Sequence, residues 1–240
     1  MGLIRTIWFY FILVLSFFFG TSLVLLFSIF GSEEQKTIKF QKAAHIWAKF
    51  MVWVSRIPVT ASGLENLPEN EPLILASNHQ GAADILILLS CIPLRFTFIV
   101  KKELFSVPIF GWYLKKAGYV GVDRGTKRGA VTLFIEASKR LKAGDHILVF
   151  PEGARSPDGK LHEFKRGSLL LAFKSKVRVV PIAISGSFEI MPIKTHFINP
   201  FPVKVKIAKP MDLGKYNNDS NLANEDLYRI IEEMLLELQK

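Results

Sequence analysis

The segment Leu73–Asp84 reads LILASNHQGAAD and combines three patterns of local structure. Its first residues, Leu73–Ala76, form a short apolar run that predicts a buried strand. Small and polar residues follow and predict a turn. An amphipathic run that predicts a helix begins near Ala83. The segment therefore predicts a strand, a turn and a helix in succession, the repeating unit of α/β proteins.

The same alternation continues from this segment towards the C-terminus. Further apolar runs predict strands at Phe96–Val100, Tyr119–Val122, Ile147–Phe150, Val179–Ile184 and Val203–Ile207. Lys127–Lys142 has apolar residues on one helical face and stops at Gly144, and the C-terminal stretch has a similar apolar face. The polar segment Pro210–Asn224 is predicted to be a surface loop. We expect residues 59–240 to form one α/β domain with a mixed sheet flanked by helices.

Residues 1–58 have a different character. The run from Thr6 to Ser32 carries no charged residue and exceeds the roughly 20 apolar residues that cross a bilayer as a helix. A cleaved signal peptide is the competing interpretation, but its apolar core is usually shorter. A second stretch, Phe40–Ile57, mixes tryptophans with cationic residues, which is typical of an interfacial helix and equally of a core helix. We expect residues 1–58 to form two membrane-binding helices that end at Pro58.

The chain has a formal net charge of +10, which indicates anionic partners such as nucleic acid, lipid headgroups or phosphorylated small molecules. No nucleic-acid-binding motif is apparent, so no nucleic-acid partner is expected. Basic residues follow the apolar run, which predicts a cytoplasmic domain if that run spans the membrane once. A hairpin held in one leaflet would void this orientation argument. The single cysteine, Cys91, rules out an intrachain disulfide.

The first candidate catalytic group is His79 with Asp84. On a regular helix, residues five apart are rotated by about 140°, so the two side chains meet only if His79 lies on the turn and Asp84 near the helix start. A carboxylate that holds one imidazole nitrogen leaves the other free to take a proton from a hydroxyl. The alternative is a turn in which Asn78 and Asp84 only cap the helix.

The second candidate is Phe150–Ser156, which reads FPEGARS and also follows an apolar strand. Glycine allows close approach of the backbone, and the guanidinium of Arg155 can bind phosphate oxygens in a bidentate manner. A surface turn is the alternative. The run from Phe164 to Gly167 adds two cations, Lys165 and Arg166. Lys115, Lys116, Lys127 and Arg128 are further cations that could attract anionic lipid or donor phosphates, or form a solvated face.

Together these motifs resemble the 1-acylglycerol-3-phosphate acyltransferase family of the glycerolipid acyltransferase superfamily. Four elements match in the family's order: Asn78-His79 with Asp84, Lys101-Lys102-Glu103-Leu104 with Pro108 and Gly111, Phe150–Ser156, and Val180-Pro181-Ile182. The resemblance covers roughly Leu73 to Ser187 by motif, and the N-terminal helices also fit bacterial members.

The resemblance implies an enzyme that moves an acyl chain from a thioester to the sn-2 hydroxyl of lysophosphatidic acid, forming phosphatidic acid. His79 would be the general base and Asp84 would orient it. Lys101 and Arg155 would bind the acceptor's phosphate, with Glu152 and Gly153 shaping that pocket. Arg124 and Lys165 are further phosphate-binding candidates, and an apolar groove nearby would hold the acyl chain.

The resemblance also implies that no metal or cofactor is needed. Acyl-CoA or acyl carrier protein would be the co-substrate. The partners would be lysophosphatidic acid and the bilayer, with the domain on the cytoplasmic side of a bacterial inner membrane. Two departures weaken statements about fine substrate preference, because members often carry serine at Gly81 and threonine at Ala154.

The sequence leaves open the donor, chain-length preference, oligomeric state, and whether the first helix spans the bilayer. Acylation of another lysophospholipid or of glycerol 3-phosphate stays open. So does lipid binding without catalysis, although the His79–Asp84 pair speaks against it.

Overall fold

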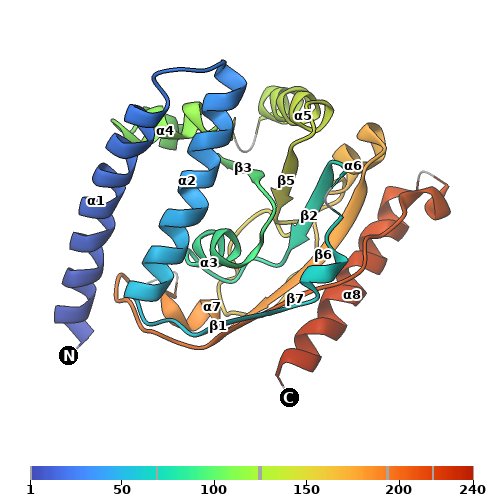
Figure 1. Ribbon diagram of the computed structural model, residues 1–240. Helices are drawn as coiled ribbons and strands as arrows, with labels where there is room; N and C mark the ends of the chain where they lie inside the picture. The colour runs from blue at the N-terminus through green and yellow to red at the C-terminus, as the bar shows by residue number, and fades with distance from the viewer. Residues whose placement is uncertain (1, 69, 124–125, 193–194, 218, 240) are drawn as a thin grey trace.

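A computed structural model describes residues 2–68, 70–123, 126–192, 195–217 and 219–239 of the 240-residue chain (Figure 1). Its centre is a seven-stranded sheet with the strand order β1-β7-β6-β2-β5-β3-β4. All neighbouring pairs are parallel except β6 with β7, which is antiparallel. The sheet is therefore mixed, as predicted. The strands are β1 (Val59–Ser62), β2 (Leu73–Ser77), β3 (Phe96–Lys101), β4 (Val120–Val122), β5 (His146–Val149), β6 (Arg178–Ser185) and β7 (Val203–Ile207).

Helices cover both faces of the sheet, with α1 and α2 on one side and α8 on the other (Figure 1). The helices are α1 (Gly2–Phe27), α2 (Glu33–Val54), α3 (Asp84–Cys91), α4 (Phe110–Lys116), α5 (Lys127–Lys142), α6 (Leu170–Ser175), α7 (Ser187–Ile190) and α8 (Ser220–Leu238). Short 3-10 turns lie at Leu64–Asn66, Lys102–Ser106 and Leu213–Tyr216.

The alternation of side chains along each strand divides the core into two layers. On β2, Leu73 and Leu75 face the layer that includes α2 and α3, whereas Ile74 and Ala76 face the layer that includes α5, α6 and α8. All four side chains are fully buried. This two-sided burial explains why β2 appears in the sequence as a continuous apolar run.

The two N-terminal helices form a hairpin that belongs to the first core layer. Ser32 caps α2 through a capping box with Gln35, which ends the turn after α1 and begins α2. Phe40 on α2 is fully buried among residues of α3 and α4, and burial of such a side chain contributes about 1.5–3 kcal/mol. The boundary proposed after residue 58 lies between α2 and β1, but both sides share one core.

Two sequence expectations need correction. The strand β1 was not predicted, because its residues, VTAS, are alternately half-buried and exposed and form no apolar run. The predicted loop Pro210–Asn224 contains a 3-10 turn and the first turn of α8. Asp219 begins α8, since its side chain accepts hydrogen bonds from the backbone N–H groups of Asn221 and Leu222.

Candidate active site

The two motifs predicted to carry chemistry meet because their strands are neighbours. Strands β2 and β5 are parallel, with Ala76 paired to Val149, so both carboxyl ends lie at the same edge of the sheet. The backbone N–H of His79 donates to Glu152 Oε1 at 2.7 Å, and the N–H of Ser156 donates to the carbonyl of His79 at 2.7 Å. The second motif therefore holds the backbone of the first.

His79 and Asp84 lie in the geometry that the sequence predicts. His79 lies on the turn after β2, and Asp84 is the first residue of α3. His79 Nδ1 and Asp84 Oδ2 are 2.6 Å apart, with the side chain of His79 13% exposed and that of Asp84 fully buried. The N–H of Gly81 donates to the same Oδ2 at 2.9 Å. The carboxylate of Asp84 therefore accepts a hydrogen bond from Nδ1–H, which leaves Nε2 as the basic nitrogen.

Asn78 contributes to this geometry without capping the helix. Its side-chain amide donates to the carbonyl of Ile184 at 2.9 Å and accepts from the N–H of the same residue at 2.8 Å. Both bonds are buried, so they tie the end of β2 to β6 and fix the backbone immediately before His79.

Phe150 fixes the plane of the imidazole ring. The rings of His79 and Phe150 are stacked, with centroids 3.9 Å apart and planes inclined by 13°. Phe150 directly follows β5, so the stacking again depends on the pairing of β2 and β5. Phe150 belongs to the second motif, but nothing in the sequence assigned it a role.

Glu152 lies behind the site. Its residue is 7% exposed, and its second oxygen accepts from the N–H of His162 at 3.2 Å. Burial raises the pKa of Glu152, while the hydrogen bonds from the backbone of His79 and His162 oppose that rise. This carboxylate orders the backbone of the site, and its negative charge does not suit direct contact with a phosphate.

A cavity of about 650 Å³ opens at His79 on the α5 and α6 side of the sheet. We call it the reaction cavity. Gly153, Lys165 and Arg166 also line it. Gly153 has a φ of +72°, and a Cβ there would lie 2.7 Å from Cδ and Cε of Lys165. The missing side chain therefore lets Lys165 extend across Gly153, and the cavity combines a base with two cations.

The other predicted phosphate ligands lie elsewhere. Lys101 ends β3 and Arg155 lies on the loop after β5, and both are exposed and absent from the described lining of the reaction cavity. Arg124 lies outside the described residues. Arg166 was noted in the sequence only as an additional cation beside Lys165. Its contribution depends on how the loop after Phe164 folds back, which spacing along the chain does not reveal.

The structure gives a reason for glycine at position 81. A Cβ there would lie 3.1 Å from the carbonyl oxygen of Ser187, a contact tighter than most real Cβ contacts. The adjacent Gln80 accepts from the hydroxyl of Ser187 at 3.2 Å and donates to the carbonyl of Gly159 at 2.8 Å. The turn that carries His79 is thus packed closely against α7 and the loop after β5.

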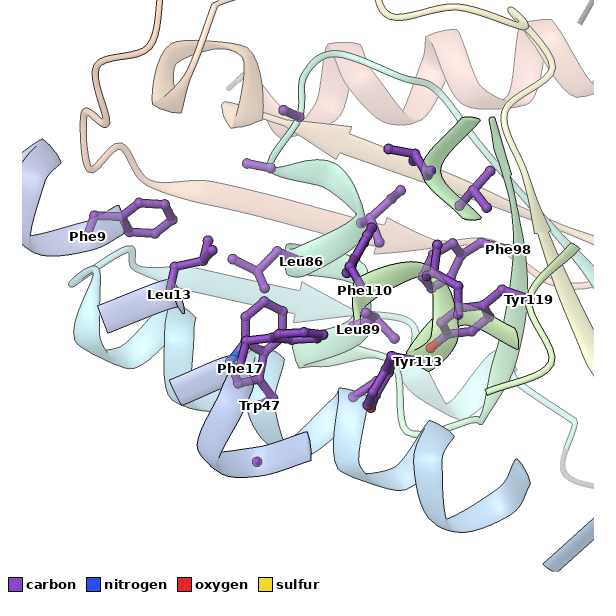
Figure 2. A pocket seen from close by; sticks show the side chains of 18 of the residues that line it. Phe9, Leu13, Phe17, Trp47, Leu86, Leu89, Phe98, Phe110, Tyr113 and Tyr119 are labelled. Atoms are coloured by element: carbon purple, nitrogen blue, oxygen red, sulfur yellow. The ribbon is translucent and has the colours of Figure 1, made fainter. Parts of the chain in front are cut away.

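An apolar chamber of about 400 Å³ lies on the opposite face of the sheet, between the N-terminal hairpin and the helices α3 and α4 (Figure 2). Its wall begins at Ala82 and Ala83, immediately before Asp84. Figure 2 shows that it is lined by Phe9, Leu13, Phe17, Trp47, Leu86, Leu89, Phe98, Phe110, Tyr113 and Tyr119. The turn that carries His79 therefore separates an apolar chamber from the cavity that Lys165 and Arg166 help to line.

Comparisons with known proteins identify the family of the chain. The profile of the Acyltransferase family matches residues 58–185. A chloroplastic 1-acyl-sn-glycerol-3-phosphate acyltransferase from Arabidopsis thaliana is 38% identical over 199 residues, which are 81% of this chain and 55% of the relative. The chain thus spans little more than half the length of that plant protein. The 1-acyl-sn-glycerol-3-phosphate acyltransferase from Pseudomonas aeruginosa is 33% identical over 186 residues, covering 75% of this chain and 70% of the relative.

A solved structure extends the similarity over the whole fold. The crystal structure of the 1-acyl-sn-glycerophosphate acyltransferase from Thermotoga maritima matches with a TM-score of 0.88 and 30% identity, covering 99% of this chain and 96% of that one. The family profile includes the ends of β2 and β5 that carry the two motifs, and the Thermotoga structure covers 99% of this chain. The chain therefore belongs to the 1-acyl-sn-glycerol-3-phosphate acyltransferase family.

Proposed function

We propose that this chain transfers a fatty acyl group from an acyl thioester to the sn-2 hydroxyl of lysophosphatidic acid, forming phosphatidic acid in phospholipid synthesis. The observation that carries the proposal is the 2.6 Å contact between His79 and Asp84, placed between an apolar chamber and a cavity with two cations. The names of the relatives support the acceptor, since they describe acylation of 1-acylglycerol 3-phosphate or lysophosphatidate.

The proposed reaction needs one base and a substrate held in place. Nε2 of His79 takes the proton of the sn-2 hydroxyl while that oxygen attacks the thioester carbonyl. The new C–O bond forms, the C–S bond breaks, and the departing thiolate takes the proton back from the imidazolium. Asp84 stabilises the imidazolium during this interval, because its carboxylate is buried and directly hydrogen-bonded to Nδ1.

The two cavities suit the two ends of the reacting lipids. Lys165 and Arg166 in the reaction cavity would hold the acceptor's phosphate, and the apolar chamber would hold the acyl chain of the donor. Lys101 and Arg155 remain candidates for steering the acceptor towards this edge of the sheet. The proposal uses the acyl thioester of CoA or of acyl carrier protein as a co-substrate and requires no metal or other cofactor.

The N-terminal hairpin would bring the enzyme to its lipid substrates. Helix α1 is long and apolar enough to cross a bilayer by length and composition. However, Arg5 donates to the carbonyl of Ile198, and Phe17 packs on Trp47 and Phe110, so α1 lies along the domain. We propose that the hairpin rests in one leaflet, with exposed apolar side chains such as Trp53 facing the lipid. We further propose that the domain lies on the cytoplasmic side of a bacterial inner membrane, as the resemblance noted in the sequence implies.

The test is thiol release by purified protein in detergent, with acyl-CoA or acyl carrier protein as donor and lysophosphatidate as acceptor. His79→Ala should abolish release, whereas His196→Ala is a matched control, because that side chain is exposed and only its backbone carbonyl contacts Tyr10. Lysophosphatidylcholine and glycerol 3-phosphate serve as competing acceptors. If no combination of donor and acceptor gives thiol release, lipid binding without catalysis would explain the site better than acyl transfer.

A further inference from the structure

Another cavity, of about 580 Å³, lies beside the reaction cavity. We call it the lateral cavity. It is lined by Lys102 and Ser106 of a 3-10 turn, Lys115 of α4, and Arg128 and Thr132 of α5. Asp123 and Thr126 line both cavities, so they form a shared rim. A ligand whose reacting end lies at His79 can therefore cross this rim and place its other end in the lateral cavity.

The cations of the lateral cavity are free to bind an anion. Lys102, Lys115 and Arg128 are exposed, and none has a carboxylate of the described chain within 4.0 Å. Neighbouring cations differ, since Lys116 pairs with Glu33. Three side chains from three separate elements thus present unpaired positive charge to one hollow.

The remaining groups of the lateral cavity also suit a phosphate. Ser106 and Thr132 are exposed and have hydroxyls that can donate to phosphate oxygens. The hydroxyl oxygen of Thr126 accepts from the N–H of Gly129 at 3.0 Å, which leaves its O–H able to donate. Asp123 is the one carboxylate among the described lining residues, and it stands against three cations. A charge-assisted phosphate site is therefore the chemistry that this lining favours.

The position of the lateral cavity points to the acyl donor. The acceptor's phosphate is assigned above to Lys165 and Arg166, close to the hydroxyl that reacts. The donor places its phosphate far from its thioester, at the other end of a flexible pantetheine arm. With the acyl chain in the apolar chamber and the thioester at His79, that arm would leave across the rim of Asp123 and Thr126.

We propose that the lateral cavity binds the phosphate of the phosphopantetheine arm that carries the acyl group. This inference rests on the proposed acyl transfer and names the part of the donor that the enzyme recognises. Acyl-CoA and acyl carrier protein both contain this phosphopantetheine, so the cavity would serve the chemistry that they share.

The test compares donors that differ only in this phosphate. The variant Lys102→Gln/Lys115→Gln/Arg128→Gln removes the cations of the lateral cavity, and Lys139→Gln/Lys142→Gln/Lys174→Gln is a charge-matched control on exposed positions outside it. The donors are acyl-phosphopantetheine, acyl-pantetheine, acyl-CoA and acyl carrier protein, with lysophosphatidate as acceptor. Wild type should prefer acyl-phosphopantetheine to acyl-pantetheine in kcat/KM.

The expected result is a selective change in donor KM. The cavity variant should raise KM for acyl-phosphopantetheine at least tenfold, should do the same for the two larger donors, and should leave acyl-pantetheine and the acceptor KM unchanged. An equal loss with acyl-pantetheine would overturn the inference, as would a loss confined to acyl-CoA or to acyl carrier protein. If wild type releases thiol and the cavity variant has an unchanged donor KM, only this inference is rejected. If wild type releases no thiol with any donor, acyl transfer itself is rejected.

Discussion

Replacing Asp84 with asparagine separates the charge of this residue from its effect on the His79 tautomer. Asp84 Oδ2 accepts from both Gly81 N–H and His79 Nδ1, at 2.9 and 2.6 Å. In the Asp84→Asn variant, an amide NH₂ at this position would face the N–H of Gly81, donor against donor. The amide oxygen therefore occupies the position, Nδ1 keeps its proton, and Nε2 stays basic. Only the negative charge is lost.

The size of the loss follows from that charge. Unit charges about 4 Å apart attract by about 4 kcal/mol at an effective dielectric constant near 20. The charges of the imidazolium and the carboxylate are each spread over several atoms, so the centres of charge of His79 and Asp84 lie at roughly this separation. The amide oxygen still accepts a hydrogen bond with a net contribution of about 0.5–1.5 kcal/mol. We therefore expect a rise in the activation barrier of about 2.5–3.5 kcal/mol, which is a fall in kcat of about 70- to 370-fold.

Stability should change as well. The other oxygen, Asp84 Oδ1, is buried without a hydrogen-bond partner in the described structure, so the NH₂ that replaces it would also lack one. This costs about 1–3 kcal/mol of unfolding free energy. Thermal unfolding should be measured first, and the assay should run well below the lowest melting temperature.

The assay is the initial rate of thiol release at saturating donor and acceptor, for wild type and the variants Asp84→Asn, Asp84→Ala and His79→Ala. Asp84→Ala removes the acceptor for both Gly81 and His79, so its kcat should lie below that of Asp84→Asn. If folded Asp84→Asn loses as much activity as His79→Ala, then Gly81 does not select the tautomer and the reasoning is wrong.

Three further predictions concern the surroundings of the site. Gly153→Ala should raise the KM for the acceptor in steady-state assays, because the new Cβ displaces Lys165. Gly144→Ala is the control, since it has the same positive-φ strain of roughly 1–2 kcal/mol but no neighbour within 4 Å. Its KM for the acceptor should therefore match that of wild type. Burial raises the pKa of Glu152, so the contribution of this residue to the free energy of unfolding falls as pH rises from the ordinary carboxyl range through that raised pKa. In urea unfolding, the free energy of unfolding of Glu152→Gln should therefore rise relative to that of wild type as pH increases over this interval. A difference between the two that does not change with pH would contradict the raised pKa. Ala44→Leu narrows the apolar chamber, so each methylene that it displaces from a long acyl donor should cost about 0.8 kcal/mol, or about fourfold in kcat/KM. The measurement is kcat/KM as a function of acyl chain length. A dependence identical to that of wild type would exclude this chamber as the acyl site.

The central strands were predictable because burial on both faces leaves a direct record in the sequence. The run Leu73–Ala76, whose residues are all buried, corresponds to a strand within one residue at either end. The run Val203–Ile207 also matches its strand, although Lys204 within it is exposed. The edge strand β1 left no such record, because its residues are alternately half-buried and exposed. The start of α8 was missed for a different reason, since the polar residues after Asp219 hid a helix whose first turn contributes little to the core.

Within the site, local geometry was predictable and long-range geometry was not. The contact between His79 and Asp84 follows from one turn and one helix start, so spacing and composition predict it. Stacking of Phe150 on the imidazole depends on which strands are neighbours, and one sequence does not specify strand order. The positions of Lys165 and Arg166 depend on a loop that returns to Pro151 through one backbone hydrogen bond of 2.9 Å. Charge counts alone could not separate these two cations from solvated ones.

The pairing of β1 with β7 imposes an order on synthesis. Val59 lies opposite Val203, so the sheet cannot close until most of the chain has left the ribosome. Helix α1 is synthesised long before its partner Ile198 and would meet the membrane with an unprotected apolar surface. The nascent enzyme would therefore be anchored before it is folded. A truncation just before β7 would leave a tethered chain with an open sheet edge, a substrate for membrane proteases rather than a partly active enzyme.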